Sequence, residues 1–234
     1  MVINSKTRLL VISPHPDDEA LGIAGLIGKC IKEKARVLIY YLCVGKSRQL
    51  VTGKTEENTR LKEIKNVANF SSAETKVEYV GDEFCRLDTI AQKELIEKIE
   101  DVIEDFKPTI AGIPSAGSYN QDHRAVYEAS ITALRPTPKE IRHFVSFVLE
   151  FYEPYLWGVT PPKNPNYYLD LSTRFKNGNL LDFKINFYKK HKTQVRKDPF
   201  PRSPQNLIRL AHVYGKEIGV EIAEAYHILR GEIW

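Results

Sequence analysis

The chain has 234 residues, of which 42% are hydrophobic and 27% charged, so it is long enough to bury a substantial core within one domain. Its net charge of +4 comes from lysines and arginines scattered among acidic residues, which is too mild and too dispersed to indicate a nucleic-acid partner. The first residues run directly into a short apolar segment, so we expect neither a secretory signal nor a membrane span, and a cytoplasmic location.

Short apolar runs alternate with segments of helical periodicity through the first two-thirds of the chain. In chain order we expect strand 8–12, helix 18–34, strand 37–43, helix 56–70, strand 76–80, helix 89–106, strand 110–114, helix 123–134 and strand 143–151. Thr89 is expected to cap the third helix, and the last strand alternates enough in polarity to lie near a sheet edge. Gly22, Gly25 and Gly28 in the first helix indicate close packing on the sheet rather than phosphate binding.

The remainder of the chain is less regular. We expect in it a proline-rich loop, a strand-like segment and two helices, at residues 154–165, 167–171, 173–191 and 204–217. Strand–helix repetition with short links predicts an α/β fold with a Rossmann-like parallel sheet flanked by helices. Because no clean linker separates the parts, we expect a single domain over residues 1–234, with a core of about 7–151 and an extension of about 152–234.

Three cysteines form no CxxC pair. Cys30 and Cys43 lie in apolar runs, which indicates buried free thiols in a reducing compartment. Cys85 lies in a loop, and thiol catalysis there is the less favoured alternative.

Polar side chains follow two of the expected strands, at the edge where parallel strands end. His15, Asp17 and Asp18 follow the first strand, and Asn120 and His123 follow the fourth. Open α/β sheets keep their ligand sites at this edge. His15 and Asp18 can converge on one metal ion that His123 joins, and two imidazoles with one carboxylate are typical of a catalytic zinc site. Asp17 is the candidate base beside it.

A structural interpretation of the same residues stays open on spacing alone. A histidine at a helix start is commonly a cap or a surface group, and acidic residues at a helix N-terminus suit the helix dipole. The other histidines are expected to be structural or surface groups: His143, His191, His212 and His227.

Two motifs resemble those of a known family. Pro14-His-Pro-Asp-Asp-Glu19, with Asn120-Gln-Asp-His-Arg-Ala-Val126 downstream, is similar to the paired motifs of the LmbE-like (PIG-L) zinc-dependent N-deacetylases. Arg60 with Glu63 resembles the R-x-x-E pattern of that family, and Arg86-Leu-Asp-Thr89 resembles its R-L-D-T segment. The resemblance covers most of the chain and implies the LmbE-like deacetylase fold.

The resemblance also implies roles for individual residues. It matches three residues to zinc ligands, namely His15, Asp18 and His123. Asp17 matches the general base, and Glu19 is expected to support the helix start. Arg60 matches a substrate-contacting arginine, with a salt bridge on the helix surface as the alternative. Iron(II) or another divalent metal could occupy the same ligands.

The chain departs from the family pattern at two places near the site. Several members carry a histidine where this chain has Asn120, whose amide can donate to an oxyanion but cannot shuttle a proton. We therefore expect Asn120 to help hold the oxyanion and Asp17 to carry the proton. The acid-rich loop before R-L-D-T is Gly81-Asp-Glu-Phe-Cys85 here, which makes Asp82 the candidate substrate-binding acid.

The resemblance implies a metal-dependent amide hydrolase that removes an acetyl group from an N-acetylated amino sugar or its conjugate. An N-acetylglucosamine glycoside, a nucleotide sugar and a glycolipid all fit that description. The expected partner is this small molecule, with no nucleic acid, and a homo-oligomer is compatible with the sequence. The alternatives are a non-catalytic sugar- or nucleotide-binding relative, or a hydrolase that removes another acyl group with the same metal site.

Overall fold

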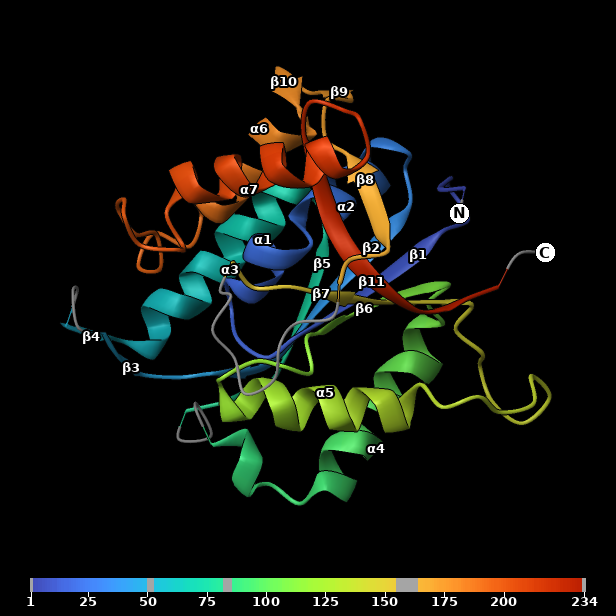
Figure 1. Ribbon diagram of the computed structural model, residues 1–234. Coiled ribbons are helices and arrows are strands. Elements are labelled where there is room, and N and C mark those ends of the chain that lie inside the picture. The colour runs from blue at the N-terminus through green and yellow to red at the C-terminus, as the bar shows by residue number, and fades with distance from the viewer. Residues whose placement is uncertain (1, 50–52, 82–85, 155–163, 233–234) are drawn as a thin grey trace.

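A seven-stranded sheet forms the centre of the computed structural model, which describes residues 2–49, 53–81, 86–154 and 164–232 (Figure 1). Its parallel strands are β1 (Arg8–Ser13), β2 (Arg36–Val44), β5 (Glu74–Val80), β6 (Ile110–Pro114) and β7 (Phe147–Phe151). Two antiparallel strands, β11 (Ala223–Gly231) and β8 (Tyr167–Asp170), extend it beyond β7. The spatial order is β5-β2-β1-β6-β7-β11-β8, which places β1 inside the sheet. The expected α/β fold with a largely parallel sheet is confirmed.

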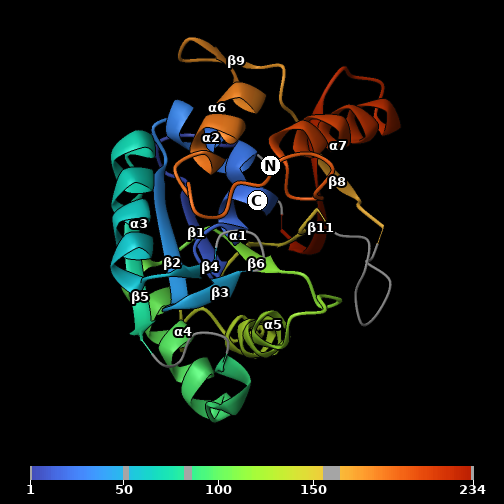
Figure 2. The ribbon, with the colours of Figure 1, turned by 90° about the vertical axis from the view of Figure 1, so that its left-hand side faces the viewer.

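Helices cover both faces of the sheet (Figures 1 and 2). One face carries α1 (Asp18–Gly22), α2 (Ala24–Lys32), α3 (Glu57–Ser71), α6 (Leu180–Tyr188) and α7 (Pro204–Glu217). The other face carries α4 (Gln92–Phe106) and α5 (Gln121–Ala133). Because side chains alternate across a strand, Leu9 and Val11 of β1 enter the first core while Leu10 and Ile12 enter the second. A strand buried on both faces explains the continuous apolar run that precedes the histidine motif.

Two small hairpins and one 3-10 turn complete the described elements. They are β3 (Ser47–Gln49) with β4 (Gly53–Thr55), β9 (Arg174–Phe175) with β10 (Gly178–Asn179), and the turn at Leu87–Thr89. No helix within the described ranges combines the length and the apolar character that crossing a membrane requires.

The strands expected in the first half of the chain are confirmed, but two boundaries differ. The expected helix 18–34 is broken at Ile23, whose φ of −140° separates α1 from α2. Thr89 does not cap α4: its hydroxyl donates to the Arg86 carbonyl at 2.7 Å, and α4 begins at Gln92. The expected edge position of strand 143–151 is also wrong, since β7 lies between β6 and β11.

The extension departs most from expectation. The segment expected as helix 173–191 contains the β9–β10 hairpin before α6. The helix expected at 204–217 is confirmed as α7, whereas β11 was not foreseen. Close packing at the glycines is confirmed, although an added Cβ at Gly28 would lie 2.6 Å from Phe183 of α6 rather than against the sheet.

Candidate metal centre and its surroundings

Three neighbouring parallel strands deliver their following loops to one edge of the sheet. His15, Asp17 and Asp18 follow β1, the segment from Asn120 to His123 follows β6, and Glu153 follows β7. Carboxyl ends of adjacent parallel strands share an edge, so residues more than a hundred positions apart meet there. The clustering expected for His15, Asp18 and His123 is observed.

The three expected metal ligands point at a common centre. His15 Nδ1 lies 3.2 Å from His123 Nε2, and the Asp18 Oδ2 atom lies 3.2 Å from His123 Nε2 and 3.5 Å from His15 Nδ1. All three side chains are buried. Tetrahedral bonds of about 2.0–2.2 Å would place ligand atoms about 3.3–3.6 Å apart, so this triangle fits a divalent ion such as zinc.

A buried aspartate orients the first histidine. Asp122 Oδ2 lies 2.8 Å from His15 Nε2, and its Oδ1 accepts the Leu87 N–H at 2.9 Å. The carboxylate favours the tautomer with the proton on Nε2, which leaves the Nδ1 lone pair facing the centre. Cys43, His15 and Asp122 also have ligand spacing, but Asp122 is already committed to these two donors.

The second histidine has a carboxylate on its far side as well. His123 Nδ1 lies 2.7 Å from Glu153 Oε1, a short contact that departs from hydrogen-bond geometry. Ser118 Oγ donates to the same oxygen at 2.8 Å. Glu153 therefore favours the proton on Nδ1 and leaves Nε2 facing the centre. Lone pairs from three residues converge, which is an arrangement that a cation stabilises.

The electrostatics of the cluster suit cation binding. Burial lowers the pKa of His123, but the Asp18 and Glu153 carboxylates outweigh it and raise that pKa to about 10. Burial raises the pKa of Asp18, but His123 and His15 outweigh it and hold the pKa well below its usual range. The cluster thus favours bound positive charge. Protons and a metal ion would compete for the same ligand atoms.

Asp17, the expected base, adopts an unusual backbone conformation. Its φ is 128° and its ψ is −25°, in a region that residues other than glycine rarely occupy. Its N–H donates to Glu19 Oε2 at 3.0 Å. Arg60 donates to its Oδ1 at 3.2 Å, and Arg202 donates to its Oδ2 at 3.0 Å. Burial raises the pKa of Asp17 against the opposing effect of Arg60.

Arg60 contacts the turn at Pro16 and Asp17 and is 1% exposed, which excludes the alternative of a surface salt bridge. Its Nη1 donates to Glu63 at 3.0 Å and to Thr193 at 3.2 Å, and its Nη2 contacts the Pro16 carbonyl and Asp17. The structure thus places Arg60 against Asp17, the expected base. Its expected role in binding substrate stays a prediction.

The two other expected site residues differ in what can be said of them. Asn120 caps α5, because its side-chain oxygen accepts the Asp122 N–H at 3.0 Å. Asp82 lies outside the described residues, as does Cys85. Both Cys30 and Cys43 are buried free thiols, as expected.

Sequence reasoning missed several residues that contact the cluster, Asp17 or Glu19. Asp122 stood inside the recognised motif, and its complete burial beside a ligand marks it in the structure. Glu153 and His191 carry no motif signal, and the Pro201-Arg-Ser203 segment, which resembles a C-terminal motif of a bacterial subgroup of the family, gives no sign that Arg202 lies beside Asp17. Their contacts arise because the loop after β7 and the extension pack against the residues that follow β1 and β6.

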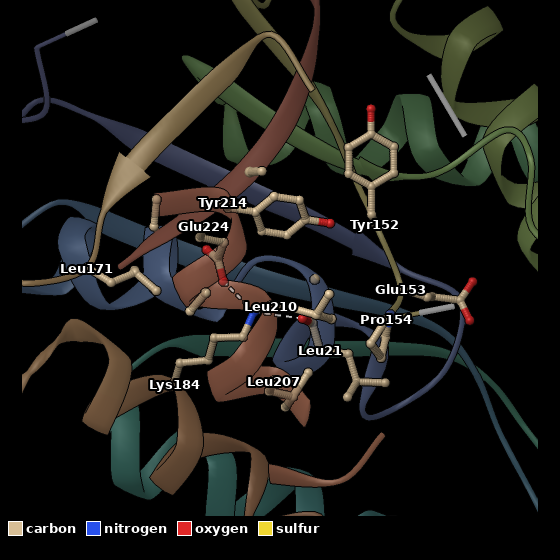
Figure 3. Close-up of a pocket in the computed structure, with 14 residues that line it drawn as sticks. Leu21, Tyr152, Glu153, Pro154, Leu171, Lys184, Leu207, Leu210, Tyr214 and Glu224 are labelled. Atoms are coloured by element: carbon tan, nitrogen blue, oxygen red, sulfur yellow. Dashed lines mark hydrogen bonds and ion pairs between the residues drawn. The ribbon is translucent and has the colours of Figure 1, made fainter. Parts of the chain in front are cut away.

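A cavity of about 30 Å³ lies beside the centre, between α1, α7 and β11 (Figure 3). Leu21, Glu153 and Tyr214 line it, together with the buried Lys184–Glu224 ion pair. This volume holds a few water molecules and is too small for a sugar ring. It is therefore a packing cavity rather than the substrate site.

Known proteins resemble this chain in sequence. Residues 10–134, more than half of the chain, match the family model PIG-L, described as GlcNAc-PI de-N-acetylase. Diacetylchitobiose deacetylase of Thermococcus kodakarensis is 23% identical over an alignment of 245 positions, covering 97% of this chain and 85% of that protein. Probable N-acetyl-alpha-D-glucosaminyl L-malate deacetylase 2 of Bacillus subtilis is 29% identical over 156 positions, covering 58% of this chain and 65% of that protein.

Solved structures share the fold. N,N'-diacetylchitobiose deacetylase from Pyrococcus horikoshii superposes with a TM-score of 0.72 at 19% identity, covering 96% of this chain and 84% of that one. GalB, the 4-carboxy-2-hydroxymuconate hydratase of Pseudomonas putida KT2440, gives 0.71 at 19% identity, covering 97% and 98%. At these identities the likeness establishes the fold, and the reaction has to be argued from the site.

Proposed function

The chain belongs to the GlcNAc-PI de-N-acetylase (PIG-L) family, and from that premise we propose that it is a metal-dependent N-deacetylase. Its substrate would be an N-acetylated amino sugar or a conjugate of one, the class that the names of its relatives describe. The observation that carries the proposal is the convergence of His15, Asp18 and His123 on one centre, with Asp17 adjacent to Asp18 in the chain. A centre with three protein ligands keeps a position open for chemistry.

The residues of the chain divide the work of amide hydrolysis. His15, Asp18 and His123 would hold a divalent cation, for which zinc is the first candidate. When bound, such a cation supplies Lewis acidity that polarises an amide carbonyl and acidifies water. Asp17 takes the proton of the attacking water and passes it to the amine nitrogen as the C–N bond breaks, giving acetate and the free amine.

Asn120 completes the proposed chemistry. As the amide oxygen of its side chain faces the start of α5, its Nδ2 group is the donor available to an oxyanion. Arg60 and Asp82 are retained as proposed substrate-binding residues, Arg60 through its contact with Asp17. We also propose cytoplasmic action, which free rather than paired buried cysteines favour.

Acetate release tests this function. Zinc-loaded protein is incubated with diacetylchitobiose, N-acetylglucosaminyl malate, a nucleotide-linked N-acetylglucosamine and an N-acetylglucosaminyl glycolipid, alongside the Asp17→Asn variant. We expect acetate from at least one substrate and a loss of about 10²–10⁴-fold in rate for Asp17→Asn. Activity that survives Asp17→Asn would overturn the mechanism.

A hydratase and a non-catalytic binding protein are the competing functions, the first because a hydratase shares the fold. Including N-propionyl and O-acetyl analogues in the panel separates a hydrolase of other acyl groups. Water addition to an unsaturated carboxylic acid without acetate release would favour the hydratase. Binding of a sugar without turnover at any metal loading would favour the binding protein.

A further inference from the structure

Glu19, the residue that follows Asp18, is also a buried carboxylate and is 0% exposed. Its Oε2 accepts the backbone N–H of Asp17 at 3.0 Å and lies 3.4 Å from the Ser13 hydroxyl. Its Oε1 accepts the Tyr41 hydroxyl at 2.8 Å and lies 2.6 Å from His191 Nε2. Glu19 thus connects the base to a histidine 172 positions away in the sequence.

His191 comes from the extension, just after α6, and it is 0% exposed. The short contact to a buried carboxylate favours the proton on Nε2, which makes this nitrogen the donor. A buried carboxylate is costly unless donors satisfy it. The described residues place three close donors on Glu19, namely the Asp17 N–H, the Tyr41 hydroxyl and His191 Nε2, while the Ser13 hydroxyl donates to the His15 carbonyl at 2.8 Å. Removal of His191 therefore leaves Oε1 with the Tyr41 hydroxyl alone among these donors.

The backbone of Asp17 depends on this arrangement. A φ of 128° is strained at an aspartate and persists where surrounding contacts over-determine it. The N–H of Asp17 to Glu19 is one such contact, and it fixes the peptide that precedes the Asp17 side chain. Fixing the Glu19 carboxylate therefore fixes the direction in which Asp17 presents its own carboxylate.

We propose that His191 is a positioning residue of the catalytic centre: it holds Glu19, and Glu19 holds the strained Asp17 peptide in the orientation that the base requires. The consequence for turnover rests on the proposed deacetylase function. The consequence for the Asp17 peptide does not, because it concerns hydrogen bonds within the chain. The extension thereby supplies a positioning residue of the site, His191, in addition to covering one face of the sheet.

The first test is hydrogen exchange at the Asp17 amide, read by NMR in metal-free protein. We compare His191→Phe, which removes the donor, with His191→Gln, whose amide nitrogen can reach Glu19 in the place of Nε2. His143→Gln is the matched control, because His143 Nε2 contacts the Pro108 carbonyl at 2.7 Å and touches neither Glu19 nor Asp17. We expect exchange to accelerate at least about tenfold in His191→Phe and to stay near wild type in the other two.

The second test is a double-mutant cycle in steady-state kinetics with Glu19→Gln. Misplacing a catalytic group by about 1 Å can lower the rate about 10²-fold. We expect His191→Phe and Glu19→Gln each to lower kcat at least about tenfold with KM and zinc content near wild type. The double variant should be no slower than the slower single variant, because both act through one contact. His191→Gln should recover most of kcat.

Three results would overturn the proposal: unchanged Asp17 exchange in folded His191→Phe, losses in kcat that multiply in the double variant, or a His191→Gln variant as slow as His191→Phe. If His191→Phe does not fold, His191→Gln and Glu19→Gln still report on exchange and on the recovery of kcat. A wild-type protein inactive on every substrate would refute the deacetylase function. The exchange experiment would still decide the role of His191.

Discussion

Asp17 combines a strained backbone with a carboxylate that two arginines contact. Two arginines from distant segments donate to its carboxylate oxygens, Arg60 from below and Arg202 from the extension. Arg60 is buried, whereas the Arg202 side chain is 24% exposed. Burial raises the pKa of Asp17, and the two guanidinium groups oppose that shift by favouring the ionised form. Hydrogen bonds to both oxygens hold the Asp17 carboxylate in one orientation, which defines the direction in which it would accept a proton.

Asn120 allows the oxyanion role to be separated from its role as a helix cap. Asn120→Ala removes both the amide donor and the cap, and loss of a cap costs about 0.5–2 kcal/mol. Asn120→Asp and Asn120→Ser keep a cap acceptor but lose the amide donor. We expect kcat to fall about 10²–10³-fold in both, with zinc content unchanged and a melting temperature near wild type. Wild-type kcat in Asn120→Ser would remove Asn120 from the mechanism.

Asp122 should control how tightly the centre binds metal. In Asp122→Asn the side-chain oxygen can still accept the Leu87 N–H. The amide NH2 group then faces His15, and it cannot accept a hydrogen bond from the protonated Nε2. Removing such an orienting carboxylate weakens metal affinity by about 10–100-fold. Competition with a chromophoric chelator measures the zinc Kd. Asp88→Asn, at an exposed aspartate of the neighbouring turn, is the matched control and should bind zinc as the wild type does.

At the scale of elements, the sequence predicted what depends on local pattern. Continuous apolar runs identify β1, β2 and β6 because these strands are buried on both faces. The strand β11 was not predicted, since Glu224, His227 and Arg230 interrupt its apolar residues. Those polar groups find partners in other elements, which a local pattern cannot reveal. The expected metal ligands cluster as predicted because two short motifs hold them, whereas His191 reaches Glu19 and Arg202 reaches Asp17 only through tertiary packing.

Element packing also creates a buried ion pair that ties the extension to the start of α2 (Figure 3). Glu224 of β11 accepts the N–H groups of Gly25 and Leu26 at 3.1 Å each, and Lys184 of α6 donates to it at 2.5 Å. The carboxylate thus satisfies orphan donors at a helix N-terminus, where negative charge is favourable. Lys184 neutralises it in turn.

Lys184→Met should therefore destabilise the protein by about 3–5 kcal/mol, since it leaves the buried Glu224 charge without its cation. The double variant Lys184→Met/Glu224→Gln should recover part of that loss. Lys29→Met serves as the control, because the Lys29–Glu33 pair is partly exposed and worth about 1 kcal/mol or less. Urea denaturation measures all three free energies of unfolding. Equal losses of unfolding free energy in Lys184→Met and Lys29→Met would show that the buried pair contributes no more to stability than the partly exposed pair.

At the scale of the whole molecule, the sheet binds the core and the extension together. β11 pairs antiparallel with β7 over Phe147–Phe151 and carries β8 on its other side, so the last strand of the core is not an edge. One hydrophobic core includes residues from β1 and from α6 and α7 alike. The site likewise depends on both parts of the chain, because Asp17 contacts Arg60 of the core and Arg202 of the extension.

We therefore predict that residues 1–234 unfold as one cooperative domain. Thermal unfolding followed by far-ultraviolet circular dichroism, by tyrosine and tryptophan fluorescence and by calorimetry should give a single midpoint, with calorimetric and van't Hoff enthalpies in agreement. A fragment that ends at residue 152 would expose the hydrogen-bonding edge of β7 and the apolar faces that α6 and α7 cover, so it should aggregate or remain unfolded. Two separated transitions, or a fragment 1–152 that folds with dispersed NMR signals, would make the extension a domain of its own. Saturating zinc should raise the single midpoint without splitting it, because an ion held between β1 and β6 stabilises the unit that unfolds.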